Sequence, residues 1–176
     1  MSAPFDNVQV DHEALPDITT IDWQPLSDRY LTEVIISRVF LLSLVAIGIG
    51  IASMAGKMPS VSIAKAALVL AAIFALQAGH AVVAVPKKGY ALRQHDVLFR
   101  TGWFFRSVTA VPLNRIQHVE LGRGPLERGL GLATLQLFTA GGSGSDLALP
   151  GLEVATGERL REFILDRINA EDDAVG

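Results

Sequence analysis

Two long apolar runs, 34–54 and 61–85, constrain this chain more than any other feature. Each run is long enough to cross a bilayer as a helix, which takes about 20 residues at roughly 1.5 Å per residue. A single segment buried in lipid becomes helical because a helix satisfies its own backbone hydrogen bonds. The short connection 55–60 makes the two helices antiparallel neighbours. The runs therefore predict a transmembrane helical hairpin with both ends on one side.

Two other interpretations fit the same runs less well. Two buried core helices of a soluble protein are normally amphipathic, and these runs are apolar throughout. A signal peptide needs a basic start and a short apolar stretch, whereas residues 1–33 hold seven acids against one arginine. We therefore favour the membrane hairpin.

Basic residues indicate the orientation of this hairpin. Lys87 and Lys88 directly follow the second run, whereas Lys57 alone lies in the connection. The positive-inside rule then puts the basic flank in the cytoplasm, with both termini on that side. The absence of cysteine agrees with a cytosolic domain.

These features divide the chain into four parts. They are an acidic arm (1–33), the transmembrane hairpin (34–85), a cytoplasmic domain (86–169) and an acidic tail (170–176). The cytoplasmic domain holds eleven basic and eight acidic residues, so it is mildly positive although the whole chain carries a net charge of −3. Its length is sufficient for an independent core.

Small residues recur every four positions along the second run and predict the packing face of the hairpin. They are Ala67, Ala71, Ala75 and Gly79. Small residues let helix backbones approach closely in lipid, although they are also common in transmembrane helices generally. Gln77 and His80 are polar and have no acidic partner in either run, so we expect an interhelical hydrogen bond or a water contact there rather than a proton path.

After the hairpin the pattern changes to short strands and one final helix. The predicted strands are 89–94, 97–101, 106–111, 115–121, 134–139 and 146–149. Segment 153–169 predicts an amphipathic helix with an apolar stripe of Leu160, Phe163, Ile164 and Ile168. Gly157 costs a helix about 1 kcal/mol, so the regular part is expected to begin there. The chain is thus an α+β membrane protein whose domain forms a small barrel or sandwich with a helix on one open end.

The order of four motifs in this domain is similar to that of a known family. The motifs are 111–119, 124–131, 135–142 and 150–152, and the stretch Trp23–Tyr30 precedes the two runs. Each piece alone is weak, but together they resemble the bacterial pleckstrin-homology-like (PH-like) membrane proteins of the YdbS type. The resemblance covers residues 23–168.

This resemblance implies a curved antiparallel sheet of about seven strands, closed at one end by a C-terminal helix. It implies a multi-pass protein of the bacterial cytoplasmic (inner) membrane. It also implies a non-enzymatic protein that works with a larger membrane partner bearing several such domains.

The residues themselves offer no catalytic constellation. The loop Gly141–Ser145 lacks the Gly-Lys-Ser/Thr ending of a phosphate loop, so a hairpin connector is favoured. The four histidines show no metal-ligand spacing, and the serines no nucleophile elbow. We expect no enzyme activity, no metal and no cofactor.

Two polar sets remain as candidate sites. The expected membrane-interface set is Lys87, Lys88, Arg93, Arg100, Trp103, Phe104 and Arg106. Aromatic residues beside basic ones favour the boundary between lipid and water, although Trp103 and Phe105 would equally suit a core. The second set is Arg115, Gln117, Arg123 and Arg128. A guanidinium group in this set either ties a turn to backbone carbonyls or binds a ligand's carboxylate or phosphate.

Three functional hypotheses follow. The first is an assembly module that presents its PH-like domain to itself, as a homo-oligomer, or to a larger PH-like membrane partner. The second is a module that senses anionic membrane lipids through its basic rim. A small subunit of a transporter or membrane enzyme has the least support, and no nucleic-acid partner is expected. Binding to anionic headgroups should weaken sharply with salt, whereas an apolar assembly surface should not.

Overall fold

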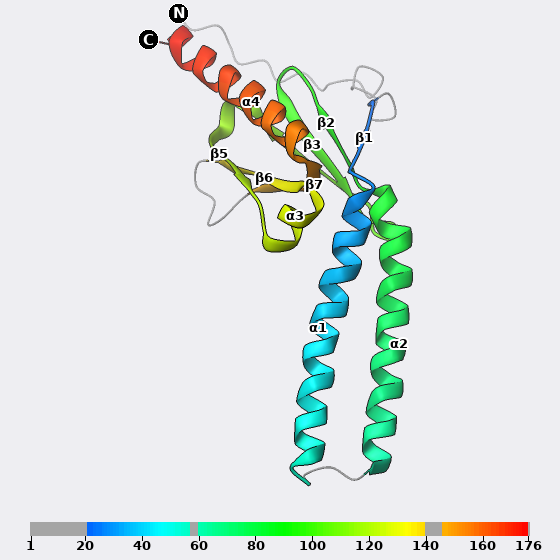
Figure 1. The fold of residues 1–176 in the computed structure, drawn as a ribbon. Helices are drawn as coiled ribbons and strands as arrows, with labels where there is room; N and C mark the ends of the chain where they lie inside the picture. Colours follow the sequence, from blue (N-terminus) through cyan, green and yellow to red (C-terminus); the bar gives the residue numbers. More distant parts are fainter. Residues whose placement is uncertain (1–20, 57–59, 140–145, 176) are drawn as a thin grey trace, which may run out of the picture.

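Two long helices project together from one end of a β domain (Figure 1). They are α1 (Arg29–Met54) and α2 (Ser60–Ala84), which lie antiparallel. This computed structural model describes residues 21–56, 60–139 and 146–175. The acidic arm up to residue 20 and the predicted connector Gly141–Ser145 lie outside the described residues.

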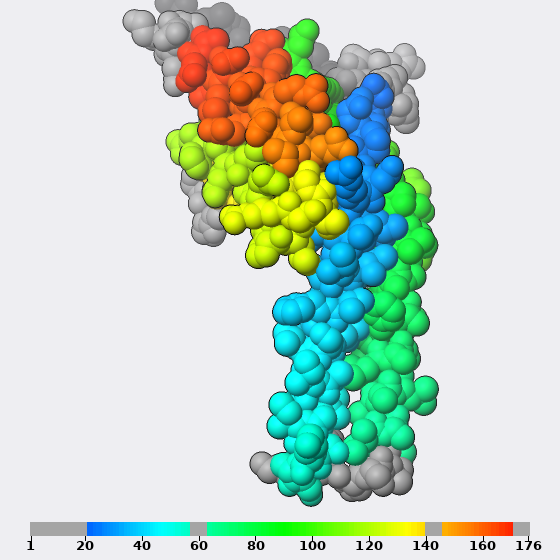
Figure 2. Space-filling view, in the orientation of Figure 1, coloured from blue at the N-terminus to red at the C-terminus, as the bar shows by residue number. Residues whose placement is uncertain are grey.

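The surface of the helical hairpin is apolar and largely uncovered. Large apolar side chains are exposed on both helices: Phe40 at 63% and Ile51 at 64% on α1, and Leu68 at 72% and Leu76 at 75% on α2. On the face shown in Figure 2, the lower part of both helices stands free of the β domain. Both helices are long and apolar enough to span a membrane. Core helices of a soluble protein would bury these side chains, so α1 and α2 are transmembrane helices.

The predicted packing stripe between the helices is wrong. Ala67, Ala71, Ala75 and Gly79 are all exposed, and a Cβ added at Gly79 would meet nothing within 4 Å. The less exposed face of α2 is instead marked by Ile63, Ala66, Leu70, Gln77 and Ala81. These residues repeat at three- and four-residue spacing, which defines one side of a helix. Larger side chains than expected therefore face α1.

Among the described residues, seven antiparallel strands form the β domain, in two sheets. The four-stranded sheet contains β1 (Gln24–Pro25), β2 (Gly89–Leu92), β3 (Asp96–Thr101) and β4 (Ser107–Pro112), in that order. The three-stranded sheet contains β5 (Ile116–Gly122), β6 (Leu132–Thr139) and β7 (Leu147–Glu153). The final helix α4 (Val154–Val175) crosses the strands (Figure 1). This arrangement agrees with the PH-like fold expected from the sequence.

The helix α4 begins earlier than predicted. It starts at Val154, three residues before Gly157, and its Leu160 and Ile164 are buried in the core. A Cβ at Gly157 would lie only 2.8 Å from Cδ1 of Leu121 in β5. The glycine allows the helix to pack closely against the strand, which offsets its low helix propensity.

The segment before α1 belongs to the β domain. Gln24 and Pro25 pair with Tyr90 and Gly89 of β2, and the following Leu26 and Tyr30 are buried in the core. The domain core therefore extends beyond the predicted boundaries 86–169. Because β1 pairs with β2, the chain enters and leaves the helical hairpin at the same end.

A short helix, α3 (Pro125–Leu130), lies between β5 and β6, where the sequence predicted no regular element. The Glu127 carboxylate accepts hydrogen bonds from the Gly124 backbone N–H and from the Thr134 hydroxyl, both at 2.6 Å. Gly131 ends the helix in the left-handed conformation, with φ of 70°. Pro125 at the first position and Glu127 at the third are start signals that the sequence displays.

Candidate functional site

The turn between β3 and β4 carries the most exposed aromatic residues of the described β domain. Trp103, Phe104 and Phe105 are exposed at 41%, 74% and 85%. Gly102 makes the turn possible with φ of +87°, because a Cβ there would lie 1.7 Å from the Phe105 carbonyl oxygen. These three aromatic side chains are surface residues, so the core interpretation of Trp103 and Phe105 is wrong.

This aromatic turn lies against the last part of α2. The rings of Trp103 and His80 are 6.3 Å apart, centre to centre, in an edge-on arrangement. Lys87 Nζ lies 5.9 Å from the centre of the Trp103 ring. His80 is four residues inside the end of α2, about 6 Å along the helix axis. The turn therefore reaches back alongside the transmembrane helix.

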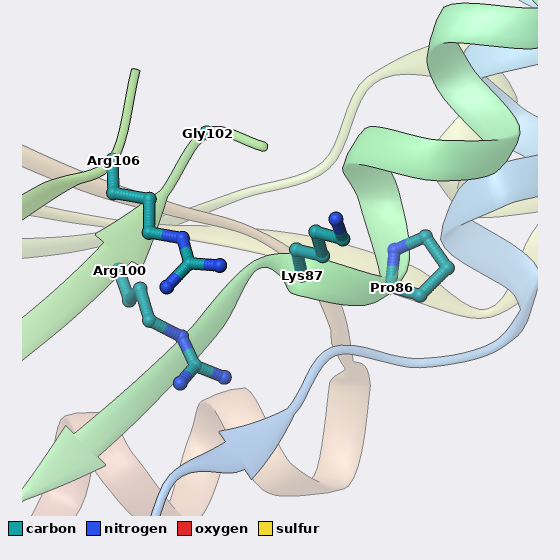
Figure 3. Close-up of a pocket in the computed structure, with 5 residues that line it drawn as sticks. All are labelled: Pro86, Lys87, Arg100, Gly102 and Arg106. Carbon is teal, nitrogen blue, oxygen red and sulfur yellow. The ribbon is translucent and has the colours of Figure 1, made fainter. Parts of the chain in front are cut away.

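A basic cavity lies between this turn and the end of α2. It has a volume of about 260 Å³ and is lined by Pro86, Lys87, Arg100, Gly102 and Arg106. Figure 3 shows Lys87, Arg100 and Arg106 around the cavity, with the Arg106 guanidinium turned toward the segment that carries Lys87 and the Arg100 guanidinium directed away from it. Three cationic side chains and no acidic one line the cavity, so its local potential is positive.

Arg100 is held by elements that are far apart in the sequence. It lies opposite Gly89 across the β2–β3 pair, and its guanidinium carbon is 4.8 Å from the centre of the Trp23 ring. Gly89 allows β1 to approach closely, because a Cβ there would lie only 3.0 Å from the Gln24 carbonyl oxygen. The Nε of Arg100 is buried and has no hydrogen-bond partner.

Five of the seven predicted interface residues come together here. Lys87, Arg100 and Arg106 line the cavity, and Trp103 and Phe104 lie on the adjoining turn. Lys88 points elsewhere: its Nζ donates a hydrogen bond of 3.2 Å to the Tyr30 hydroxyl. Arg93 lies in the turn between β2 and β3, at the end of the sheet remote from the helices (Figure 1).

The predicted position of Arg93 at the membrane surface is therefore wrong. Strand β2 runs away from α2, so a residue close to the helix in sequence is carried to the far end of the hairpin. There Arg93 pairs with Asp96, with Nε donating to Oδ1 at 2.6 Å. This hydrogen bond raises the pKa of Arg93 above its ordinary value.

The second predicted set is divided between two roles. Arg123 and Arg128 tie the α3 region together: Arg123 Nε donates to the Leu132 carbonyl at 3.3 Å, and Arg128 Nε donates to the Arg123 carbonyl at 3.2 Å. Arg115 and Gln117 are exposed near the start of β5, where the strand register shifts. The structure does not bring these four residues around one cavity among those described.

One of the two polar positions of α2 takes part in an interhelical hydrogen bond, as expected. The backbone carbonyl of Gln77 accepts a hydrogen bond from the Arg38 guanidinium of α1, which links the two helices. His80 is exposed and faces the Trp103 ring. Sequence reasoning missed Trp23 as part of the site, because only the pairing of β1 with β2 brings it to Arg100, and it missed Gly89, which lies opposite Arg100 across the β2–β3 pair.

Two transmembrane helices that carry a PH-like β domain define the class of this protein as a membrane-anchored PH-like protein. The sequence signature of the family described as "Bacterial PH domain" matches residues 34–168, and the chain belongs to this family. The matched range covers most of α1 and all of α2, but it leaves β1 outside.

One relative supports this assignment. The chain is 32% identical over 112 residues to the UPF0699 transmembrane protein YdbS of Bacillus subtilis (strain 168). The alignment covers 61% of this chain and 69% of that protein. No solved structure matches. The family is one of transmembrane PH-like proteins and is not a known family of enzymes.

Proposed function

We propose that this chain is a non-catalytic module that holds its PH-like domain against the cytoplasmic leaflet of the bacterial inner membrane. The contact of Trp103 with His80 carries the proposal, because it sets an exposed aromatic turn beside a transmembrane helix. Tryptophan and phenylalanine beside basic residues favour the layer between lipid tails and water. In this proposal the turn enters the headgroup layer, and Lys87, Arg100 and Arg106 face anionic lipids.

The charge distribution supports the cytoplasmic orientation. Four basic residues lie at the end of the hairpin that bears the β domain, namely Lys87, Lys88, Arg100 and Arg106. Lys65 lies toward the other end, near the start of α2, and Lys57 falls between α1 and α2 in the sequence. The chain has no cysteine, so single cysteines report cleanly. In intact cells an impermeant thiol reagent should label Ala55→Cys and leave Asn114→Cys unlabelled. The reverse result would put the β domain outside.

The position of the aromatic turn is tested by tryptophan quenching. Trp23 and Trp103 are the two tryptophans, so Trp23→Phe leaves Trp103 as a single probe. In full-length protein reconstituted with lipids brominated near the headgroup end of the acyl chain, Trp103 fluorescence should be strongly quenched. The matched control is Trp103→Phe, in which Trp23 is the remaining tryptophan. The fluorescence of Trp23 should be quenched much less. Equal quenching of the two variants would count against insertion of the turn.

Assembly with another PH-like domain is the second candidate, and the free edge of the four-stranded sheet favours it. Strand β4 ends the sheet order, five of its six residues are exposed, and Val108 is 45% exposed. An uncovered edge strand is a template for pairing with another chain. Native mass spectrometry in lipid nanodiscs should then show an oligomer, or a complex with a larger PH-like protein, that Val108→Lys weakens. Leu126→Lys on α3 is the control and should leave assembly intact.

A further inference from the structure

The cavity beside α2 has the properties of a binding site for an anion. Of its five lining residues three are cationic, none is acidic, and two are a proline and a glycine that add no hydrogen-bonding side chain. Its volume of about 260 Å³ exceeds the roughly 30 Å³ that one water molecule occupies in the liquid. Three cations around one space repel each other, and an anion between them removes this repulsion.

The Arg100 side chain is held in place by the protein but is not fully hydrogen-bonded within it. Its Nε is buried without a hydrogen-bond partner, and leaving such a group unsatisfied is costly, more so for a charged one. The Trp23 ring lies against the guanidinium group, with 4.8 Å between the ring centre and Cζ of Arg100. The donors of Arg100 are therefore preorganised rather than free to turn to solvent.

We propose that this cavity binds a phosphate group through Lys87, Arg100 and Arg106. Arginine forks match phosphate oxygens in pairs, and the lysine adds a point charge. A tetrahedral phosphate accepts hydrogen bonds from several directions at once, which suits donors that come from the end of α2, from β3 and from the start of β4.

The phosphate belongs either to an anionic phospholipid or to a soluble phosphate compound. The lipid source rests on the proposed function, because it requires the aromatic turn to lie in the headgroup layer. Pro86 and Lys87 directly follow α2, so a lipid packed beside that helix has its headgroup at the level of the cavity. The soluble source does not depend on that placement.

The first test uses inorganic phosphate with the full-length protein in phosphatidylcholine nanodiscs. Sodium phosphate, compared with sodium chloride at equal ionic strength, should raise the melting temperature of the wild type, because a ligand that binds the folded state stabilises it. In Arg100→Gln and in Arg106→Gln, about ten times more phosphate should be needed to give the same rise in melting temperature. Arg93→Gln is the matched control, because Arg93 lies at the far end of the sheet, and it should respond like the wild type.

The second test uses nanodiscs of one part phosphatidylglycerol to three parts phosphatidylcholine, followed by native mass spectrometry. Retention of phosphatidylglycerol by the wild type and by Arg93→Gln, with loss in Arg100→Gln, identifies the lipid as the source. A response to inorganic phosphate without retained phosphatidylglycerol identifies a soluble phosphate. If Arg100→Gln does not fold, the exposed Arg106→Gln and the charge-retaining Arg100→Lys carry the comparison.

The site proposal is overturned if neither probe distinguishes the wild type from Arg100→Gln and Arg106→Gln, or if Arg93→Gln is equally impaired. Its failure is separable from failure of the proposed function. Trp103 quenching measured in phosphatidylcholine alone reports the depth of the turn and does not need the phosphate site. Quenching without phosphate binding rejects the site alone, whereas phosphate binding without quenching rejects the membrane placement alone.

Discussion

Gly151 is the residue on which the attachment of α1 to the β domain depends. Its φ of +68° is left-handed, and it lies where the register between β6 and β7 shifts. Its carbonyl accepts a hydrogen bond of 3.0 Å from the Ser27 backbone N–H, and the Tyr30 ring packs directly against it. The bulge at Gly151 thus provides space for the Tyr30 ring and a carbonyl acceptor for the Ser27 N–H. Together these contacts hold the start of the first transmembrane helix.

Gly151→Ala should strongly destabilise the protein. A Cβ at this position would lie 2.3 Å from Tyr30 Cγ, and the backbone conformation itself disfavours a side chain. Gly129→Ala is the matched control, because a Cβ there meets nothing within 4 Å and alanine favours the helix α3 by about 0.5–1 kcal/mol. Thermal unfolding in detergent should show a large loss for the first variant and none for the second. Equal melting temperatures would contradict this role of Gly151.

Asp146 should make the stability of the β6–β7 end depend on pH. Its Oδ2 accepts hydrogen bonds of 2.7 Å from the Thr139 backbone N–H and hydroxyl, and these bonds lower the pKa of Asp146. A carboxyl group with a lowered pKa stabilises the fold above its ordinary pKa, near 4, and loses this effect as pH falls through the lowered value. The difference in melting temperature between wild type and Asp146→Ala should therefore narrow between about pH 5 and pH 3.

At the scale of elements, the two transmembrane helices do not meet through the predicted stripe of small residues. The less exposed face of α2 contains Ile63, Ala66 and Leu70, while the small-residue stripe faces outward. The Arg38 guanidinium adds a hydrogen bond to the Gln77 carbonyl across the pair. Size alone is therefore a poor guide to the packing face, because alanine and glycine are frequent on every side of α2.

Ala81→Leu and Ala75→Leu make the same chemical change on opposite faces of α2. Ala81 is 1% exposed, so a larger side chain should overpack its surroundings and cost about 1–3 kcal/mol. Ala75 is exposed, so leucine there should extend into lipid or detergent with little effect. Thermal unfolding of the full-length protein should separate the two variants by several degrees. A greater loss for Ala75→Leu would restore the small-residue stripe as the interface.

Most elements were predictable from the sequence because they have local signals. Alternating residues between glycine and proline turns placed six strands close to their observed positions, and the stripe of Leu160 and Ile164 placed α4. Strand β1 has only two residues, so it has no alternation, and its partner β2 lies beyond both helices.

The candidate site was predictable only in part, for the same reason. Four site residues were expected together because they are close in the sequence. They are Lys87, which follows α2, and Arg100, Trp103 and Arg106, which lie on β3 and the turn after it. Arg93 was misplaced because strand direction, and not distance along the sequence, decides which end of a hairpin lies near the helices. Trp23 was missed because its contact with Arg100 depends on the β1–β2 pair.

At the scale of the whole molecule, the transmembrane hairpin is inserted between two neighbouring strands. Tyr30 near the start of α1 and Lys88 after α2 are joined by a hydrogen bond of 3.2 Å, so the two connections to the membrane lie side by side. No long linker separates either helix from the sheet, since β2 begins five residues after α2 ends. The β domain is thus held at two adjacent points.

A soluble version of the domain should need the segment before α1. A chain that joins residues 21–33 through a short Gly-Ser linker to residues 82–175 retains β1, Leu26 and Tyr30, and we expect it to unfold cooperatively. Residues 86–175 alone lack these core groups and should unfold at much lower temperature or without cooperativity. Circular dichroism melts of the two chains provide the comparison. Equal stability would show that the β1 segment is dispensable.

The pairing of β1 with β2 also makes completion of the fold report on membrane insertion. The ribosome delivers β1 first, and its partner follows only after both transmembrane segments have been made. If one helix fails to insert, the two strands end up on opposite sides of the bilayer and cannot meet. The domain then keeps an open sheet edge and an empty place for Tyr30, which is the kind of surface that quality-control proteases and chaperones act on. The β domain can therefore be completed only when both transmembrane helices have inserted with the correct topology.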